Sequence, residues 1–200
     1  MTIVIVYIII ITYCLENKDE VMADNITVIP NRYVVFDLET TGFSPEYAEI
    51  IEIGAVRVEN GIIVSRFQTY VKPFKRIPYN ITELTGITDN MVKNAPRIED
   101  AIVKFLDYIG NDILVAHNAS FDMRFVCTVC AFLGLDIQNP VIDSVRLAKK
   151  YIKGTQNYKL ETLKHYLGIR LDSHNASDDC TVTYNVVERC RKLMNEAAVK

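Results

Sequence analysis

The chain has 200 residues, of which 50% are hydrophobic and 24% charged, and its formal net charge at pH 7 is -3. These values are typical of a globular domain and argue against a disordered or fibrous chain. A domain of this length buries roughly 70% of the surface that its unfolded chain exposes, so its core suffices for folding. The slightly acidic balance excludes a strongly basic protein that binds nucleic acid by phosphate neutralisation alone. An enzyme that meets nucleic acid through bound metal ions stays compatible with it.

The first residues form an apolar segment without charged side chains. Met1 to Leu15 includes a run of isoleucine, valine and tyrosine from Ile3 to Ile11. The segment is shorter than the about 20 residues that span a bilayer, and no basic residue precedes it as in a secretory signal. Three interpretations stay open: an extra strand, a weak membrane anchor, or residues translated from upstream of the true start. We expect residues 1–31 to be an extension of unknown role, and a cytoplasmic protein without stable membrane association.

The cysteines support a reducing compartment. Their number is odd and their spacing irregular, which is a poor disulfide framework; they are Cys14, Cys127, Cys130, Cys180 and Cys190. Cys127 and Cys130 have the spacing of half a zinc site, but no second pair completes it. Because they lie in the apolar run 121–133, we predict that they are buried structural residues.

Strands dominate the chain after the extension. Tyr33–Leu38 is a short apolar run that ends in acidic residues and a glycine, as a buried central strand does. The runs 50–59 and 62–71 are alternating or β-branched, and Asn60-Gly61 between them favours a type I′ hairpin turn. Three prolines and a glycine punctuate residues 73–97, which predicts a long irregular connection with a helical turn.

Helices dominate the second half. Apolar residues recur at helical spacing over 98–110, and a glycine is placed to end that helix. Residues 113–116 form another apolar strand, a helix follows over about 120–133, and 141–143 suggests a short fifth strand. Three further helices are predicted near 143–152, 159–167 and 177–195. This order predicts an α/β layer architecture whose first three strands form an antiparallel meander.

Acidic residues lie at the end of one predicted strand and near the starts of two predicted helices. Asp37 and Glu39 end the first buried strand, and alternation places both side chains on one face. Two neighbouring carboxylates repel each other, so a cation or a proton must offset that repulsion. Asp122 falls in the first turn of the helix after strand 113–116, and Asp179 near the start of the last helix. Taken singly, both also fit an acidic first turn that stabilises the helix dipole.

The four carboxylates together predict a site of hard oxygen ligands, which suits Mg²⁺ or Mn²⁺ rather than zinc. His174 lies five residues before Asp179, and an imidazole that titrates near neutral pH can act as a general base there. The alternative for this segment is a helix start capped by Ser177. An alternative for the first motif is the DxDxT of haloacid-dehalogenase-type phosphatases, but the third position here is Glu39.

Three motifs in this order resemble the DEDDh class of 3′→5′ exonucleases, also called DnaQ-like, which includes the proofreading epsilon subunit of bacterial DNA polymerase III. They are Asp37-x-Glu39-Thr40-Thr41-Gly42, His117-Asn118-Ala119-x-Phe121-Asp122 and His174-x-Ala176-x-x-Asp179. The flanking segments 49–55, 84–88 and 159–163 resemble the exonuclease domain of the large Gram-positive replicative polymerase. The resemblance covers about residues 32–191, with every catalytic position of the class present.

This resemblance implies a ribonuclease H-like fold, with a mixed five-stranded sheet flanked by helices, in an exonuclease domain over residues 32–195. It implies two Mg²⁺ (or Mn²⁺) ions held by Asp37, Glu39, Asp122 and Asp179, and it implies that His174 deprotonates the attacking water. The product would be a nucleoside 5′-monophosphate, released from the 3′ end of the strand.

The resemblance also implies a single-stranded 3′ end as substrate, with DNA expected from a role in proofreading or repair, and a DNA polymerase as a candidate partner. Expected contacts of the terminal nucleotide are Thr40, Thr41, Ile87, Asn118 and Phe121. Phe121 fits a core position equally well, and His117 is expected to be structural. Two alternatives stay open: an RNA-trimming exoribonuclease of the same family, and a catalytically silent module that binds a polymerase. The motifs do not reveal the contacts to the 2′ position that distinguish RNA from DNA.

Overall fold

Five strands form one mixed sheet in the order β3-β2-β1-β4-β5 in this computed structural model, which describes residues 28–171 and 175–198. The strands are β1 (Arg32–Thr40), β2 (Ile50–Glu59), β3 (Ile62–Tyr70), β4 (Leu114–Ala116) and β5 (Val141–Asp143). The first three pair antiparallel, whereas β4 is parallel to both β1 and β5. The helices are α2 (Tyr79–Thr85), α3 (Asp89–Val92), α4 (Ile98–Ile109), α5 (Ala119–Leu133), α6 (Ser144–Tyr151), α7 (Leu160–Tyr166) and α8 (Ala176–Ala198).

The antiparallel meander follows from the turn between β2 and β3. Asn60 has a φ of 51° and Gly61 a φ of 77°, and both values belong to the left-handed region that a type I′ turn requires. The predicted hairpin is therefore confirmed. In the other pairing, β1 and β2 are in a register that sets Asp37 opposite Gly54 and Glu39 opposite Glu52.

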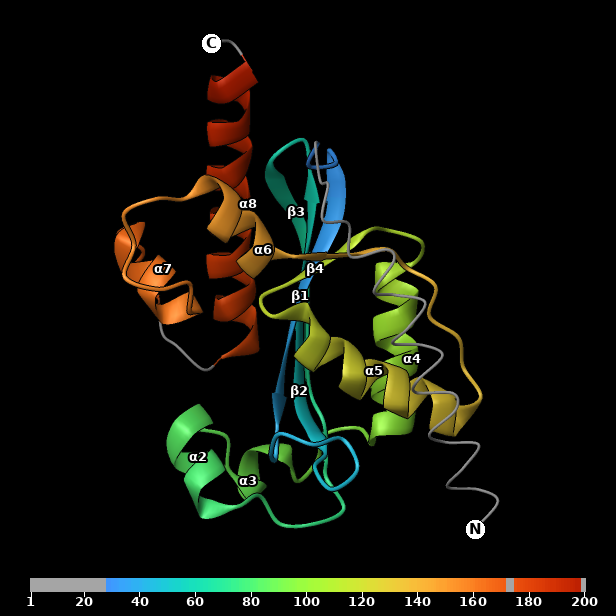
Figure 1. Cartoon of the computed structure of the whole chain (residues 1–200). Coiled ribbons are helices and arrows are strands. Elements are labelled where there is room, and N and C mark those ends of the chain that lie inside the picture. Colours follow the sequence, from blue (N-terminus) through green and yellow to red (C-terminus); the bar gives the residue numbers. More distant parts are fainter. Residues whose placement is uncertain (1–27, 172–174, 199–200) are drawn as a thin grey trace.

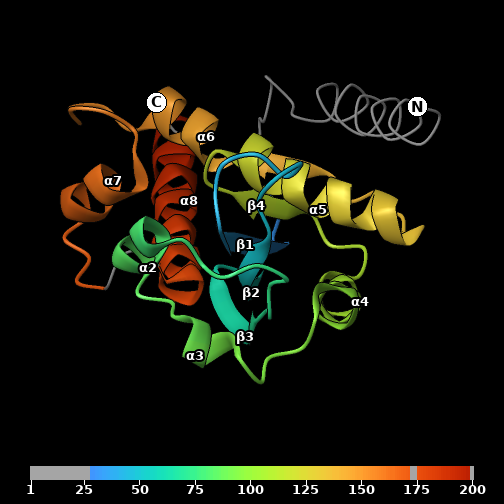
Figure 2. The same cartoon turned by 90° about the horizontal axis from the view of Figure 1, so that it is seen from below.

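Helices cover both faces of the sheet (Figures 1 and 2). The cluster on one face joins Val34 and Phe36 of β1 to buried side chains of α4 and α5. The cluster on the other face joins Tyr33 and Val35 to buried side chains of α6 and α8. Because side chains alternate along a strand, Asp37 continues the second series and lies on the α8 face. The predicted α/β fold with a mixed five-stranded sheet between helices is confirmed.

The connection from β3 to α4 is more ordered than predicted. Residues 73–97 hold two short helices, α2 and α3, where the prolines and the glycine indicated an irregular loop. Ile81 of α2, Val92 of α3 and Ile77 just before α2 are buried together against Ile51 of β2. That packing stabilises helices that are too short to form alone.

The predicted ends of the other elements agree with the structure within a few residues. Cys127 and Cys130 are buried, as predicted, and the other described cysteines, Cys180 and Cys190, are buried as well. Residues 1–27, which include Cys14 and the apolar segment Met1 to Leu15, lie outside the described residues. Within residues 28–171 and 175–198, no helix is both long and apolar enough to cross a bilayer.

Packing of the folded domain begins slightly before β1. Ile29 is buried, and the Arg191 guanidinium of α8 donates hydrogen bonds to the carbonyls of Ile29 (2.8 Å) and Pro30 (2.9 Å). These contacts fix the approach to β1 against the long C-terminal helix. The residues immediately before β1 therefore pack with the domain.

Candidate active site

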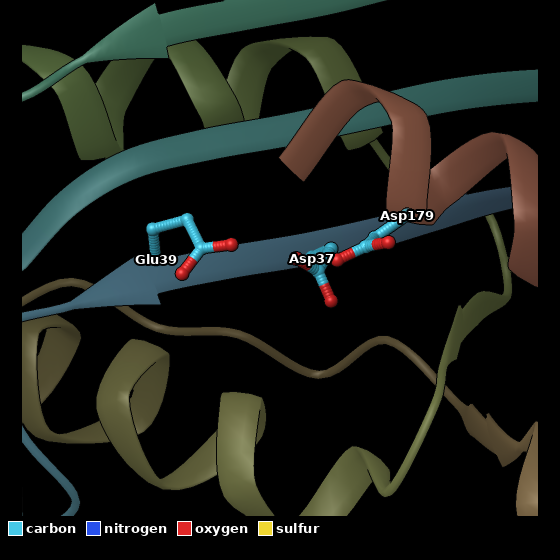
Figure 3. Close-up of side chains that lie close together, drawn as sticks. All are labelled: Asp37, Glu39 and Asp179. Atoms are coloured by element: carbon cyan, nitrogen blue, oxygen red, sulfur yellow. The ribbon is translucent and has the colours of Figure 1, made fainter. Parts of the chain in front are cut away.

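Carboxylates of β1 and α8 come together on one face of the sheet. Asp37, Glu39 and Asp179 each offer one oxygen atom, and these atoms all lie within 4.8 Å of one another. Figure 3 shows the Asp179 side chain reaching from α8 toward Asp37 on β1, with Glu39 further along the same strand. Residues far apart in sequence thus form one cluster, because α8 packs with its first turn beside β1 and β2.

Asp122 borders this cluster from α5. It lies in the first turn of α5 and is 3% exposed. The backbone at Leu38 and at Asp122 itself hydrogen-bonds its carboxylate, which ties the start of α5 to β1. Asp122 is not among the three residues whose oxygens lie within 4.8 Å, but its charge helps to raise the pKa of Asp37.

Burial and repulsion shift the protonation of the whole group. Burial is the larger cause, and the charges of Asp179, Glu52 and Asp122 add to it, which raises the pKa of Glu39 to about 8. The same two causes raise the pKa of Asp37 well above its usual range, and burial raises that of Asp122. A charged carboxylate is disfavoured where neither water nor a counter-charge surrounds it.

The donor set suits a divalent metal ion. Three carboxylate oxygens at mutual ligand spacing are hard donors, which Mg²⁺ and Mn²⁺ prefer, and their shared negative charge needs a cation. A metal ion between them would reverse the direction of the pKa shifts, because it favours the charged form of each carboxylate. The residues therefore could hold a metal in their ionised state at neutral pH.

Glu52 of β2 positions the start of α8. Its side chain is fully buried, with one carboxylate oxygen 2.7 Å from Gln68 Nε2. The other oxygen accepts a hydrogen bond from the backbone N–H of Ala176 (3.3 Å), the first residue of α8. Two residues after Glu52, Gly54 lets the helix approach, because a Cβ there would lie 2.6 Å from the carbonyl carbon of Ala176.

The remaining amides of the first turn of α8 are also satisfied. The Asn175 side-chain oxygen accepts from the N–H groups of Ser177 (3.1 Å) and Asp178 (3.2 Å), and its carbonyl accepts from Asp179 N–H (2.9 Å). Asn175 is therefore the cap, and the predicted alternative of capping by Ser177 is wrong. With Glu52 on Ala176, the N–H groups of the first three residues of α8 all have partners, and the Asp179 N–H makes the first bond within the helix, so Asp179 stands on a fixed turn.

The sequence predicted no role in the site for three residues that position α8, namely Glu52, Gly54 and Asn175. A charged residue within the apolar run of β2 was the available signal, because such a residue in a buried strand needs a partner. Asn175 directly precedes the helix and is a preferred cap residue. Their partners could not be identified, because the contacts join β2 to a helix more than a hundred residues later.

The predicted substrate residues of the β1 end have specific places. Thr40 is 8% exposed and donates from Oγ1 to the carbonyl of Gly42 (2.6 Å). Thr41 Oγ1 accepts from the N–H of Glu49 (2.8 Å), which closes the loop after β1. Ile87 is 2% exposed and packs in the cluster that holds α2 and α3 to the sheet. The nucleotide contacts of these residues stay predictions.

The second motif surrounds the start of α5. Asn118 precedes that helix with a φ of 67°, is exposed, and donates its backbone N–H to Asp143 Oδ1 (3.1 Å). Phe121 is half-buried, with its ring 5.2 Å from that of Phe125. The two ring nitrogens of His117 are hydrogen-bonded to Ser144 Oγ (2.8 Å) and the Tyr158 carbonyl (2.9 Å), as a structural histidine would be. His174, the predicted base, lies outside the described residues.

The sheet order and the acidic cluster define the class of protein, a nuclease with a ribonuclease H-like fold. The exonuclease family RNase_T matches residues 34–187, so the chain belongs to that family. The chain is 45% identical over 167 residues to the DNA polymerase III PolC-type of Clostridium perfringens, and 41% identical over 173 residues to that of Bacillus subtilis. These matches cover 83% and 84% of this chain but 12% of each relative.

Solved structures of exonucleases have the same fold. Exonuclease X in complex with 5′ overhanging duplex DNA is 28% identical with a TM-score of 0.66, over 83% of this chain and 93% of that one. The nuclease domain of 3′hExo, a DEDDh family member bound to rAMP, is 23% identical with a TM-score of 0.69, over 82% and 92%. The predicted resemblance to DEDDh exonucleases is confirmed by the family and the fold.

Proposed function

We propose that the chain is a metal-dependent 3′→5′ exonuclease that removes nucleoside 5′-monophosphates from single-stranded DNA. The observation that carries this proposal is the convergence of Asp37, Glu39 and Asp179 to within 4.8 Å, with Asp122 beside them. The PolC-type polymerase relatives and the DNA-bound exonuclease X support DNA as substrate.

The four carboxylates would hold two Mg²⁺ or Mn²⁺ ions. When bound, such ions stabilise charge on the attacking and leaving oxygens of an in-line displacement at phosphorus. Asp37 has acidic neighbours from both β1 and α8, so it is suited to contribute to both positions. Glu39 and Asp179 would complete one of them, and Asp122 would support the other.

His174 would take the proton of the attacking water. In the sequence it precedes α8 by two residues, and Glu52 and Asn175 hold the first turn of that helix in place. A base whose imidazole titrates near neutral pH is matched to this step.

The terminal nucleotide would lie against the loop after β1 and the start of α5. Thr40, Thr41 and Asn118 would contact its sugar and phosphate, while Ile87 and Phe121 would contact its base or sugar. Apolar contacts accept any base, which suits trimming without sequence preference. We place the protein in the cytoplasm, and we propose a DNA polymerase as its partner, as the PolC-type relatives suggest.

The test compares 3′-labelled with 5′-labelled single strands of DNA and RNA, each with Mg²⁺, Mn²⁺ or EDTA. We expect a metal-dependent ladder that shortens from the 3′ end, faster on DNA, and lost in Asp37→Ala. Asp107→Ala, which removes an exposed carboxylate from α4, is the matched control and should retain full activity. Faster degradation of RNA would assign the chain to RNA trimming. Folded, metal-loaded protein that leaves both substrates intact would favour the catalytically silent module and overturn the proposal.

A further inference from the structure

A pocket lined by basic side chains lies at the edge of the sheet where β1 and β3 both end. Its volume is about 470 Å³, and it is bounded by the loop from β3 to α2 and by α3. Its lining includes four cationic residues and one acidic residue, which are Lys72, Lys75, Arg76, Lys93 and Asp89. None of the described residues assigned to metal binding or to the terminal nucleotide lines it. This basic pocket is therefore separate from the proposed active site.

The cations of the basic pocket are available to a ligand. Residues 72–76 hold three basic side chains and no acidic one. Lys75, Arg76 and Lys93 are exposed, and no carboxylate in the part of the chain that the structure describes forms an ion pair with them. The Asp89 carboxylate accepts a hydrogen bond from a backbone N–H of the loop (3.0 Å). The pocket thus carries an excess of positive charge, although the formal net charge of the chain is -3.

An exposed aromatic ring stands among these cations. Phe74 lines the basic pocket and is 68% exposed, and the Arg97 guanidinium lies 4.4 Å from the centre of its ring. Arg97 is held in place because it donates to the carbonyls of Lys72 (3.3 Å) and Pro73 (2.8 Å). A cation therefore supports the ring from one side, and its exposed part is open to a second planar group.

The loop that carries these residues is attached to the loop after β1. Glu49 exchanges two hydrogen bonds with Thr41, each of 2.8 Å. The Glu49 carboxylate accepts from the backbone N–H groups of Phe74 (2.6 Å) and Lys75 (3.1 Å). Thr41 is a predicted contact of the terminal nucleotide, so one residue connects the basic pocket to the substrate side of the active site. A strand whose 3′ end lies at the carboxylates would reach the pocket with nucleotides further from that end.

Single-stranded nucleic acid has both of the chemical groups that this pocket suits. Its phosphates carry the negative charge that exposed lysine and arginine side chains bind, and every base has a planar face that stacks on an aromatic ring. An acidic peptide offers the charge without a base for the Phe74 ring. Because the active-site carboxylates repel phosphates that no metal ion holds, a cationic contact outside them favours the binding of a longer strand.

We propose that the basic pocket is a second contact site for the single strand, in which a base stacks on Phe74 and phosphates bind Lys75 and Arg76. The inference rests on the proposed function, because the strand that is trimmed is the occupant. The chain should therefore bind strands that reach the pocket more tightly than strands that end within the active site.

The test measures binding to the full chain with Asp37→Ala, so that strands stay intact. Fluorescence anisotropy of 5′-labelled oligothymidines of about 2 to 12 nucleotides should show a step in affinity at the length that reaches the pocket. Lys75→Ala with Arg76→Ala should weaken binding of the long strands about tenfold and leave the shortest unchanged. It should also reduce the slope of log Kd against log salt by about 1.4, the value for two phosphate contacts of a single strand. Lys104→Ala with Lys192→Ala removes the same charge from exposed positions of α4 and α8 and should have neither effect.

Phe74→Leu tests the stacking, because it keeps an apolar side chain and removes the ring. We expect the long strand to bind at least about fivefold more weakly, and an abasic strand of equal length to bind as before. Equal affinities at all lengths, or unchanged affinities in both variants, would overturn the proposal. An oligoglutamate of equal charge that binds as tightly as the strand would assign the pocket to an acidic peptide and also overturn it.

Binding in this test does not depend on cleavage. A chain that shows the length step but degrades no strand would contradict only the proposed function. An active nuclease without the length step would contradict only this inference.

Discussion

The two faces of β1 serve opposite purposes, although they alternate within nine residues. Val34, Phe36 and Leu38 point toward α4 and α5 and are at most 5% exposed, so this face contributes hydrophobic burial. Asp37 and Glu39 point toward α8, where burial and repulsion raise the pKa of both. One face stabilises the domain, while the other holds charge at the expense of stability, as functional sites commonly do. Substitutions of the acidic residues should therefore change mainly the activity, whereas substitutions on the apolar face should lower the free energy of unfolding.

The largest change in activity is expected on the acidic face of β1, which carries Asp37 and Glu39 and faces α8. Asp37→Asn removes a carboxylate that is proposed to hold the metal ions, and the loss of several kcal/mol of charge stabilisation should lower kcat/KM about 10³-fold. In EDTA, however, the same change removes a carboxyl that the fold keeps protonated while the unfolded chain ionises it, so the free energy of unfolding at neutral pH should rise by about 1 kcal/mol. Activity assays measure the expected decrease in kcat/KM, and urea denaturation in EDTA measures the expected increase in the free energy of unfolding. A metal-free variant that is less stable than the parent would contradict the interpretation of the acidic face as strained.

On the opposite, apolar face of β1, a substitution should lower the stability and leave the activity of the folded protein nearly unchanged. Phe105 of α4 is fully buried, with its ring 5.6 Å from that of Phe36. Phe105→Ala should lower the free energy of unfolding by about 3–5 kcal/mol, because it leaves a cavity in the core. Its folded fraction should keep near-normal kcat. The matched control is Phe132→Ala on the exposed side of α5, for which urea denaturation should show a change within about 0.5 kcal/mol.

The pH dependence of stability sharpens the comparison. The pKa of Glu39 is raised to about 8 from an ordinary 4.5, so the folded metal-free chain keeps a proton that the unfolded chain releases between these values. The stabilisation is complete below pH 4.5 and is lost as the pH rises to about 8. We expect a decrease of about 3.5 kcal/mol in the free energy of unfolding from pH 5 to pH 8 in EDTA.

Two controls isolate the contribution of Glu39. Glu39→Gln lacks the titrating group, so its stability should change less over the same interval, and the difference between the two chains cancels all other groups. Saturating Mg²⁺ should also flatten the profile of the parent, because a bound cation favours the ionised carboxylate. Identical slopes for the parent and Glu39→Gln in EDTA would show that this carboxyl keeps an ordinary pKa.

A smaller effect is expected at the contact that joins β2 to α8. Glu52→Gln leaves one acceptor oxygen where two are used, so either Gln68 or Ala176 loses its partner. Loss of one such hydrogen bond should weaken Mn²⁺ affinity about tenfold and speed amide exchange at Ala176. Calorimetry and hydrogen exchange measure these changes. Glu59→Gln, at the exposed end of the same strand, should alter neither, and an unchanged Mn²⁺ affinity in Glu52→Gln would exclude a positioning role.

The sequence by itself determined most of the helices and strands and which face of β1 carries the acidic residues. Alternation in β1 was sufficient to set Asp37 and Glu39 on one face, and Asn60-Gly61 was sufficient to specify the hairpin, because both depend on the backbone of a few adjacent residues. The motif order indicated the exonuclease family, which the match over residues 34–187 confirms.

Only the tertiary structure decided which side chains meet. The helices within 73–97 form because Ile51 of β2 covers their apolar residues, a contact that local propensity does not contain. The first N–H group of α8 has its partner in Glu52, from a strand far away in sequence, and Gly54 allowed the close approach. Local rules fix backbone geometry, whereas partners across the sheet are fixed by packing that no short segment encodes.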